Sequence, residues 1–364
     1  MKKKIKRYLL KYIFFLKISF YKNYLRHSFN TFIEIIFYYN FNFTKFFKNY
    51  KANSSQLKYL EFICSRSFLN IFSTSTYQHE NLRFSQKTIT FKNKKIEIIY
   101  LTSEAIRVHL DRINQLTNRF IIIMGNSDLT IDYNIQDITK LLNNRLLVKI
   151  YSQNIKIKHK KVVQLPLGVP LHSDFYFDFI SRKKILPFSS QKKLIKAIKF
   201  KIKKKYLIYC NYHFAMNSER ANCKKKLLKS LCYYTPKRIS LKNTWNEIKN
   251  YQFIVCPEGN GVDTHRVWEG LLLGAIPIVK INFLSPLYGK LPIIIIKDWS
   301  QVNLNFLDQQ LKKIKSRKYD FSILFMNYWI NEIYQKKNIS KKIKYDLFLS
   351  SLSKNDIKRL KHYI

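Results

Sequence analysis

Short apolar runs alternate with amphipathic stretches over most of this 364-residue chain. The runs are rich in β-branched and aromatic residues, and they predict strands at 98–101, 120–124, 146–151, 162–165, 206–212, 253–255, 276–279 and 293–296. Helical periodicity predicts helices at 102–116, 135–142, 220–231, 241–250, 264–273 and 304–314. Because strands that alternate with helices build parallel sheets covered by helices, the pattern predicts an α/β fold.

The alternation falls into two blocks, which a lysine-rich stretch without glycine separates at about 180–205. We therefore expect one Rossmann-like domain at 56–185 and a second at 200–335. A basic amphipathic region (1–55) precedes them, and a basic helical tail (336–364) follows. In open parallel sheets, ligands bind where strand carboxyl ends lead into helix N-termini, so these loops are the candidate functional sites.

The charge of the chain is strongly basic, with 67 Lys and Arg against 22 Asp and Glu, a formal net charge of +45. A charge of this size raises the question of nucleic-acid binding. The lysines are spread along the whole chain, and the commonest residues share A/T-rich codons. The charge therefore favours a solvated basic surface, with an anionic membrane or a phosphorylated ligand as further alternatives and no nucleic-acid partner.

The cysteines and the N-terminus argue against several classes of protein. Five scattered cysteines without a Cys-x-x-Cys pair argue against a zinc site and a dense disulfide framework and favour buried thiols, with one bridge in an oxidising compartment as the alternative. Residues 1–29 lack the roughly 20 apolar residues of a bilayer span. One helical face of this segment is apolar, so an interfacial helix, a helix packed on the next domain and a degenerate signal anchor remain open. We expect a membrane-associated protein, in the Golgi or endoplasmic reticulum or at a cytoplasmic membrane face.

Four of the seven glycines fall within 16 positions of the segment "CPEGNGVDTHRVWEGLLLGAIPIVK" at 256–280: Gly259, Gly261, Gly270 and Gly274. The pattern predicts a strand at 253–255, a loop at 256–262 and a helix at 264–273. We expect Asp263 to be the N-cap and Gly274 to be a left-handed residue after the helix. We expect Gly259 and Gly261 to take positive φ and to let the backbone approach a ligand.

The predicted helix separates a polar face from an apolar face: His265, Arg266 and Glu269 against Val267, Trp268 and Leu271. Helix N–H groups together with Arg266 suit a diphosphate. Glu269, one turn deeper, suits the hydroxyls of a ribose. The alternative is an ordinary capped surface helix on which Arg266 and Glu269 form a solvated pair.

The segment "PEGNGVDTHRVWEGLLLGAIPIV" resembles the sugar-nucleotide motif of exostosin-like glycosyltransferases of the GT-B architecture, and more loosely that of the fucosyltransferases. The matching residues are Pro257, Gly259, Gly261, Asp263, Arg266, Trp268, Glu269, Leu271, Gly274, Pro277, Ile278 and Val279. Asn260, Thr264 and His265 lie between them and are assigned to the same pocket by proximity. The resemblance implies two Rossmann-like domains whose parallel sheets face a central cleft.

Weaker similarity to the same family extends over about 95–335. The segment 206–228 resembles the strand, loop and Arg-bearing helix at the start of the nucleotide-binding domain, which implies that Arg220 contacts phosphate. An ordinary surface arginine is the alternative. Segments 121–132, 162–170 and 291–303 resemble further strand ends of the family.

The resemblance implies an enzyme that moves a sugar from a nucleotide-diphosphate donor to a hydroxyl of a glycan, protein or lipid acceptor. It implies no cofactor and no metal, and the chain contains no Asp-x-Asp triplet. Asp128 is the candidate catalytic base, with an N-cap or Asx-turn role as the alternative. His172 is a weaker candidate, and His213 is a candidate phosphate contact. A non-catalytic binding protein of the same fold is the second hypothesis, and a basic nucleic-acid-binding protein is the third.

Overall fold

The protein is known from a computed structural model, which describes residues 62–64, 68, 84–91, 94–125, 127–135, 138–170, 193–194, 197–198, 204–334 and 343–344. They belong to one compact unit, Asn53–Ile364. The predicted regions 1–55 and 336–364 lie almost entirely outside the described residues, as does His172. The predicted domain limits and the membrane association therefore stay predictions. No helix in the described part of the chain is both long and apolar enough to cross a bilayer.

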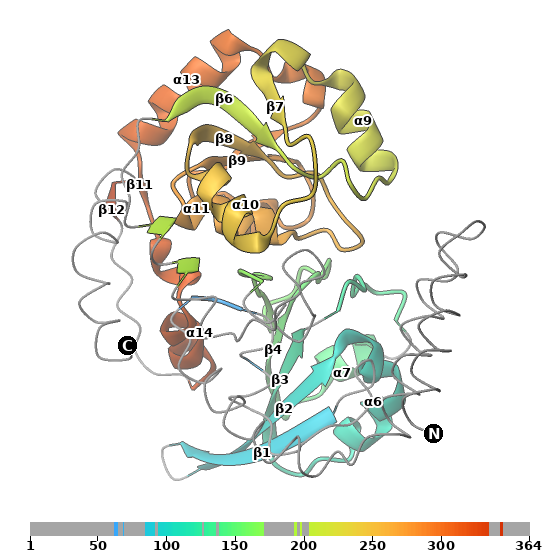
Figure 1. Ribbon diagram of the computed structural model, residues 1–364. Coiled ribbons are helices and arrows are strands. Elements are labelled where there is room, and N and C mark those ends of the chain that lie inside the picture. Colours follow the sequence, from blue (N-terminus) through green and yellow to red (C-terminus); the bar gives the residue numbers. More distant parts are fainter. Residues whose placement is uncertain are drawn as a thin grey trace, which may run out of the picture. The chain divides into compact units, whose positions relative to one another are not determined.

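The first sheet contains five strands in sequence order: β1 (Phe84–Phe91), β2 (Lys94–Thr102), β3 (Arg119–Gly125), β4 (Leu147–Ser152) and β5 (Val162–Gln164). β2 to β5 pair in parallel, and β1 pairs antiparallel with β2. Three helical segments connect its strands: η1 (Ser103–Ala105), α6 (Ile106–Asn114) and α7 (Ile138–Asn143). The helices α6 and α7 lie against one face of the sheet (Figure 1).

The second sheet is wholly parallel, in the order β10 (Ile294–Ile296), β9 (Ile276–Lys280), β8 (Tyr251–Val255), β6 (Lys205–Cys210) and β7 (Cys232–Tyr234). Its helices include α9 (Ser218–Lys226), α10 (Leu241–Ile248), α11 (His265–Leu272) and α13 (Leu304–Ser316). Figure 1 shows α9 and α13 on one face of this sheet and α10 and α11 on the other. The predicted α/β class with parallel sheets is confirmed.

Shorter elements complete the described chain: η3 (Lys229–Leu231), α12 (Ser285–Tyr288), η4 (Trp299–Gln301), β11 (Lys318–Tyr319), η5 (Phe321–Leu324), α14 (Met326–Ile333) and β12 (Ile343–Lys344). Each predicted strand and helix has a counterpart in the structure, with ends that differ by a few residues. The antiparallel edge strand β1 and the three-residue strand β7 were not predicted. The helix expected to reach residue 231 ends at Lys226 and gives way to a 3-10 turn.

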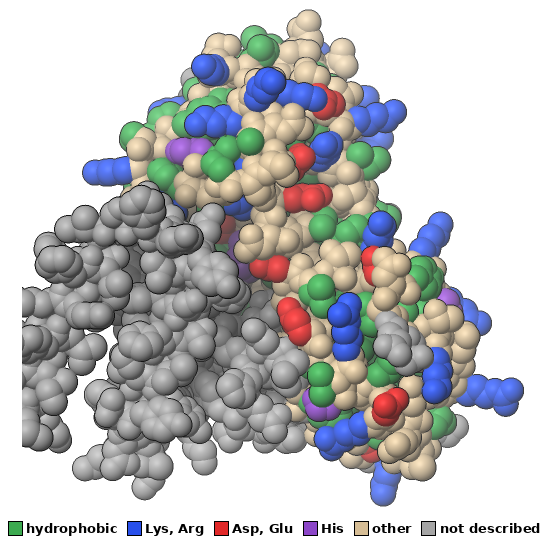
Figure 2. Space-filling model, turned by 90° about the vertical axis from the view of Figure 1, so that its right-hand side faces the viewer, with side chains coloured by type: hydrophobic (Ala, Val, Ile, Leu, Met, Phe, Trp, Pro, Cys, Tyr) green, Lys and Arg blue, Asp and Glu red, His purple; other side chains and the backbone are tan. Residues whose placement is uncertain are grey.

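Both faces of the first sheet are buried, as expected for parallel strands covered on two sides. Along β3, Ile122 and Met124 pack with α6 and α7, whereas Ile121 and Ile123 belong to the cluster on the other face. Among the side chains that the structure describes, no Lys or Arg is buried. On the face drawn in Figure 2, Lys and Arg side chains are spread among other side chain types and do not merge into one patch.

Candidate functional site

The glycine-rich segment folds into β8, a loop, α11 and β9, as predicted. The apolar face of α11 is buried against the sheet, where Val267, Trp268 and Leu271 are at most 1% exposed. Gly274 follows the C-cap with φ of 76°. Its N–H donates to Leu271 O at 3.3 Å, and the N–H of Ala275 donates to Gly270 O at 2.8 Å, which is a Schellman motif. The prediction of a left-handed glycine is confirmed.

Gly270 is explained by close packing of α11 on the sheet. A Cβ atom at this position would lie 2.7 Å from Ile254 Cγ2 on β8. Because no side chain tolerates such a contact, glycine sets how closely the helix can approach the strand. The helix therefore holds its first turn in a fixed position at the carboxyl end of β8.

Asp263 is not the N-cap of α11, so that prediction is wrong. The N-cap is Thr264, and no side-chain hydrogen bond caps the helix. The Asp263 carboxylate is buried and accepts from Leu167 N at 2.8 Å, Tyr288 Oη at 2.9 Å and Trp268 Nε1 at 3.0 Å. Leu167 and Tyr288 come from distant segments, so a pattern of capping residues in the sequence does not reveal them.

The buried Asp263 carboxylate holds the start of α11 to the segment after β5. Burial raises its pKa to about 6, while the Leu167, Tyr288, Trp268 and Thr264 donors act in the opposite direction. At neutral pH the group is therefore ionised, and its hydrogen bonds are charge-assisted. Thr264 beside it is 7% exposed, and its buried Oγ1 has no hydrogen-bond partner in the part of the chain that the structure describes.

His265 is half-buried, and its Nδ1 lies 2.6 Å from Gly168 O. Because a carbonyl oxygen only accepts, Nδ1 carries the proton in this contact. Burial and the nearby Arg266 charge lower the pKa of His265 to about 4, and the hydrogen bond to Gly168 O opposes that shift. The imidazole is therefore neutral at pH 7 and does not add a positive charge to the site.

This pKa predicts how stability changes with pH. His265 binds protons more readily in the unfolded chain, near pH 6.5, than in the folded chain, near pH 4. The free energy of unfolding therefore rises as the pH increases from 4 to 6.5, by up to about 3 kcal/mol from this group. Measured by urea unfolding, the difference in the free energy of unfolding between wild type and His265→Gln should therefore grow as the pH rises. Asp263 titrates with the opposite sign, but it contributes to the free energy of unfolding of both proteins. A constant difference across these pH values would contradict the assignment.

Arg266 lies half-buried on the first turn of α11, and its Nε donates to Asn211 Oδ1 at 2.7 Å in the loop after β6. Its Nη groups have no hydrogen-bond partner in the described part of the chain. The ion pairs described in this part of the protein are Lys226–Asp298 and Lys280–Glu219, so no carboxylate pairs with Arg266. The guanidinium group of Arg266 therefore has N–H donors and a positive charge that are available to a ligand.

Glu269 is only 4% exposed, which makes the alternative of a solvated Arg266–Glu269 pair wrong. Its Oε1 accepts from Trp245 Nε1 of α10 at 2.8 Å. Burial raises the pKa of Glu269, and the Trp245 bond and the Arg266 charge oppose that shift. Its Oε2 has no hydrogen-bond partner among the residues that the structure describes. Glu269 is thus held by α10 through one carboxylate oxygen, and its other oxygen has no partner among the described residues.

The loop glycines do not take positive φ, so that expectation is wrong. The close approach is instead to other protein groups. A Cβ atom on Gly259 would lie 2.8 Å from Arg220 Nη2, and one on Gly261 would lie 3.1 Å from Asp128 Oδ1. The absence of side chains therefore lets the loop lie directly against two candidate site residues.

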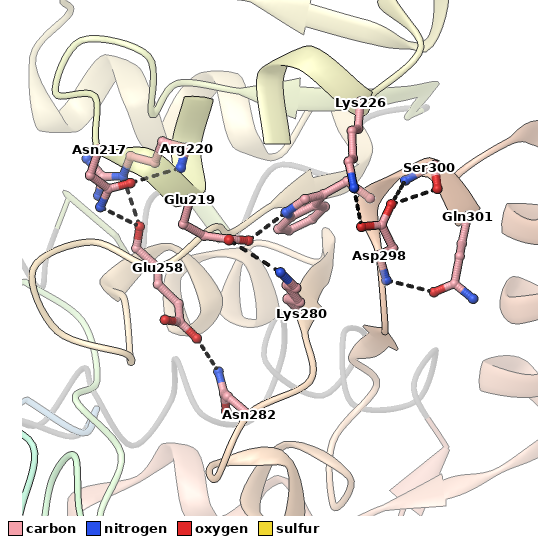
Figure 3. Close-up of polar contacts among 11 residues, drawn as sticks. Asn217, Glu219, Arg220, Lys226, Glu258, Lys280, Asn282, Asp298, Ser300 and Gln301 are labelled. Atoms are coloured by element: carbon pink, nitrogen blue, oxygen red, sulfur yellow. Dashed lines mark hydrogen bonds and ion pairs between the residues drawn. The ribbon is translucent and has the colours of Figure 1, made fainter. Parts of the chain in front are cut away.

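Arg220 supports this loop and is not an isolated surface arginine (Figure 3). Its Nε donates to Glu258 O at 3.2 Å and its Nη1 to Ala215 O. Asn217, the N-cap of α9, donates through Nδ2 to Gly259 O at 3.0 Å. Burial and the nearby Arg266 charge lower the pKa of Arg220, so the two guanidinium groups lie within electrostatic reach of each other.

The remaining candidates lie on neighbouring loops. Asp128 and Asn260 are exposed, and the Asp128 carboxylate accepts no hydrogen bond from the described residues, whereas the neighbouring Ser127 hydroxyl accepts from Leu129 N at 2.9 Å. His213 Nε2 lies 2.9 Å from Thr235 O, and burial lowers its pKa, so it is a neutral side chain near Arg266. The structure thus gathers Arg220, Arg266, Gly261 and Asp128 around one loop.

Sequence reasoning missed several residues of this site, namely Asn154, Asn211, Asn217, Trp245 and Glu258. Asn154, Asn211 and Glu258 each follow the end of a strand within three residues, which is the signal that could have identified them.

No group of three or more His, Cys, Asp or Glu side chains in the described ranges is arranged to hold a metal ion. The chain matches no model of a known protein family, and no curated protein is significantly similar to it.

Proposed function

We propose that the protein is a glycosyltransferase of the GT-B type, which transfers a sugar from a nucleotide-diphosphate donor to an acceptor hydroxyl. One observation carries the proposal: the start of α11 combines a helix N-terminus without a side-chain cap with Arg266, whose Nη donors have no partner among the described residues. The buried Thr264 hydroxyl, which also has no partner in the described ranges, lies at the same position. Guanidinium donors and positive charge beside helix N–H groups suit a diphosphate.

The donor would bind along the first two turns of α11. Arg266, Thr264 Oγ1 and the helix dipole face the diphosphate, and Glu269 Oε2 accepts from sugar or ribose hydroxyls. Arg220 acts mainly through the loop that it supports and adds a second positive charge. When the bond to the sugar breaks, negative charge develops on the departing diphosphate, and these fixed cations stabilise it without reorganisation.

Asp128 is the proposed base for the acceptor hydroxyl. It is exposed on the loop after β3, and Gly261 of the donor loop lies against its carboxylate. No hydrogen bond in the described residues occupies this carboxylate, so it is available to accept a proton. In this proposal the two parallel sheets belong to the two Rossmann-like domains, and the acceptor reaches the donor from the first one.

A thermal-shift screen tests the donor. We expect one uridine or guanosine diphosphate, or its sugar conjugate, to stabilise the protein by about 2–3 kcal/mol at 100 times its Kd. Inorganic pyrophosphate at the same ionic strength is the control, because a charge of +45 attracts any polyanion. Equal stabilisation by pyrophosphate, or none by any nucleotide, would remove the proposal. Slow hydrolysis of the nucleotide sugar would distinguish an enzyme from a non-catalytic binding protein.

A further inference from the structure

Asn154 has an unusual backbone conformation at the carboxyl end of β4. Its φ is +49°, and it is the sole non-glycine residue with positive φ in the described chain. It is 2% exposed. Asparagine tolerates the left-handed region better than most residues, although at a cost. Such conformations persist where surrounding structure enforces them, and they are concentrated at functional sites.

The side-chain amide of Asn154 connects two loops. Its Nδ2 donates to Ser127 O at 3.1 Å, in the residue before Asp128. Its Oδ1 accepts from Asp263 N at 3.2 Å, two residues before α11. A Cβ atom on Gly261 would lie 3.0 Å from Asn154 Nδ2, so the donor loop packs directly on this amide.

The loop that carries Asp128 is held from both sides. The Ser127 hydroxyl donates to Glu104 Oε1 at 2.6 Å and accepts from Leu129 N. The Ser127 carbonyl accepts from Asn154. Because Asn154 donates to one loop and accepts from the other, only a primary amide of this length satisfies both contacts.

We propose that Asn154 is a positioning residue, which sets the distance and direction of Asp128 relative to the sugar bound at α11. The inference rests on the proposed function. Asn154 itself contacts neither of the reacting groups in this account. Its effect is on geometry, and a misplacement of about 1 Å between reacting groups is enough to cost roughly 100-fold in rate.

Asn154→Gly tests the proposal, because glycine keeps the positive φ and removes the amide. With the nucleotide sugar that the wild type hydrolyses, we expect kcat to fall roughly 100-fold while the Kd of the corresponding nucleoside diphosphate changes less than about threefold. Gln164→Leu is the matched control. Gln164 also joins a segment after β4 to a segment after β9, by donating to Ile155 O and Phe283 O, but it forms no hydrogen bond with the loop of Asp128 or with the glycine-rich loop. Its kcat should stay within about threefold of wild type.

Asn154→Asp provides a second variant if the glycine variant does not fold. The carboxylate can still accept from Asp263 N, but it cannot donate to Ser127 O, so kcat should fall while nucleotide binding persists. An unchanged kcat in a folded Asn154 variant, or an equal loss in Gln164→Leu, would overturn the inference. If no nucleotide stabilises the wild type, the proposed function itself fails, and the inference fails with it.

Discussion

Replacing Arg266 with alanine is expected to weaken binding of the nucleoside diphosphate by roughly 30-fold or more, while the melting temperature of the free protein stays nearly constant. Removing one partner of a desolvated charge contact costs about 2–5 kcal/mol. The protein itself loses only the Asn211 bond and no ion pair, because no carboxylate of the described residues is paired with this arginine. Calorimetric titration of both proteins with the same diphosphate measures the difference.

Arg317→Ala is the matched control for this prediction. Arg317 is an exposed C-cap residue of α13, so the substitution removes the same charge from another part of the surface. If both variants lose affinity equally, general charge attraction explains binding and α11 is not the site. Glu269→Ala is a poorer test, because it would leave Trp245 Nε1 buried without its acceptor and so lower stability directly.

Replacing Asp263 with asparagine is expected to lower the free energy of unfolding by about 3 kcal/mol. The buried carboxylate accepts from Leu167, Trp268 and Tyr288, and an amide would direct two hydrogens of its own toward these donors. Each buried donor without an acceptor costs about 1–3 kcal/mol. Urea unfolding monitored by tryptophan fluorescence measures the loss, since Trp268 lies in direct contact with the substituted group.

Asp111→Asn is the control for the stability prediction, because Asp111 is exposed on α6 and its side chain has no hydrogen-bond partner among the described residues. It should change the free energy of unfolding by less than about 0.5 kcal/mol. A similarly small effect at Asp263 would show that the carboxylate does not hold the segment after β5 to α11. In that case the position of the whole candidate site would need another explanation.

The fold was largely predictable because periodicity reports which side chains a helix or strand buries. The run at 120–124 became β3 with both faces covered, and the Gly274 signal correctly ended α11. β1 escaped prediction because its sequence FSQKTITF has the mixed polarity of an edge strand and no continuous apolar run. β7 is only three residues long, which is too short for a period to be recognised.

The site was predictable only in part, because tertiary partners decide the role of each side chain. Arg266 lies on the first turn of α11, as its spacing indicated. Asp263 looked like a cap from its position, but Leu167 and Tyr288 offered a buried alternative that no local pattern contains. A solvated Glu269 was an open alternative in the sequence, because its partner Trp245 comes from another helix. Asn154 gave no sequence signal beyond its place after a strand.

A crystal structure with the nucleoside diphosphate that stabilises the protein most would test the central claim directly. We expect diphosphate oxygens within about 3 Å of the Arg266 Nη groups and of Thr264 Oγ1, at the first turn of α11. A diphosphate held elsewhere, with the start of α11 still in contact only with protein and solvent, would contradict it.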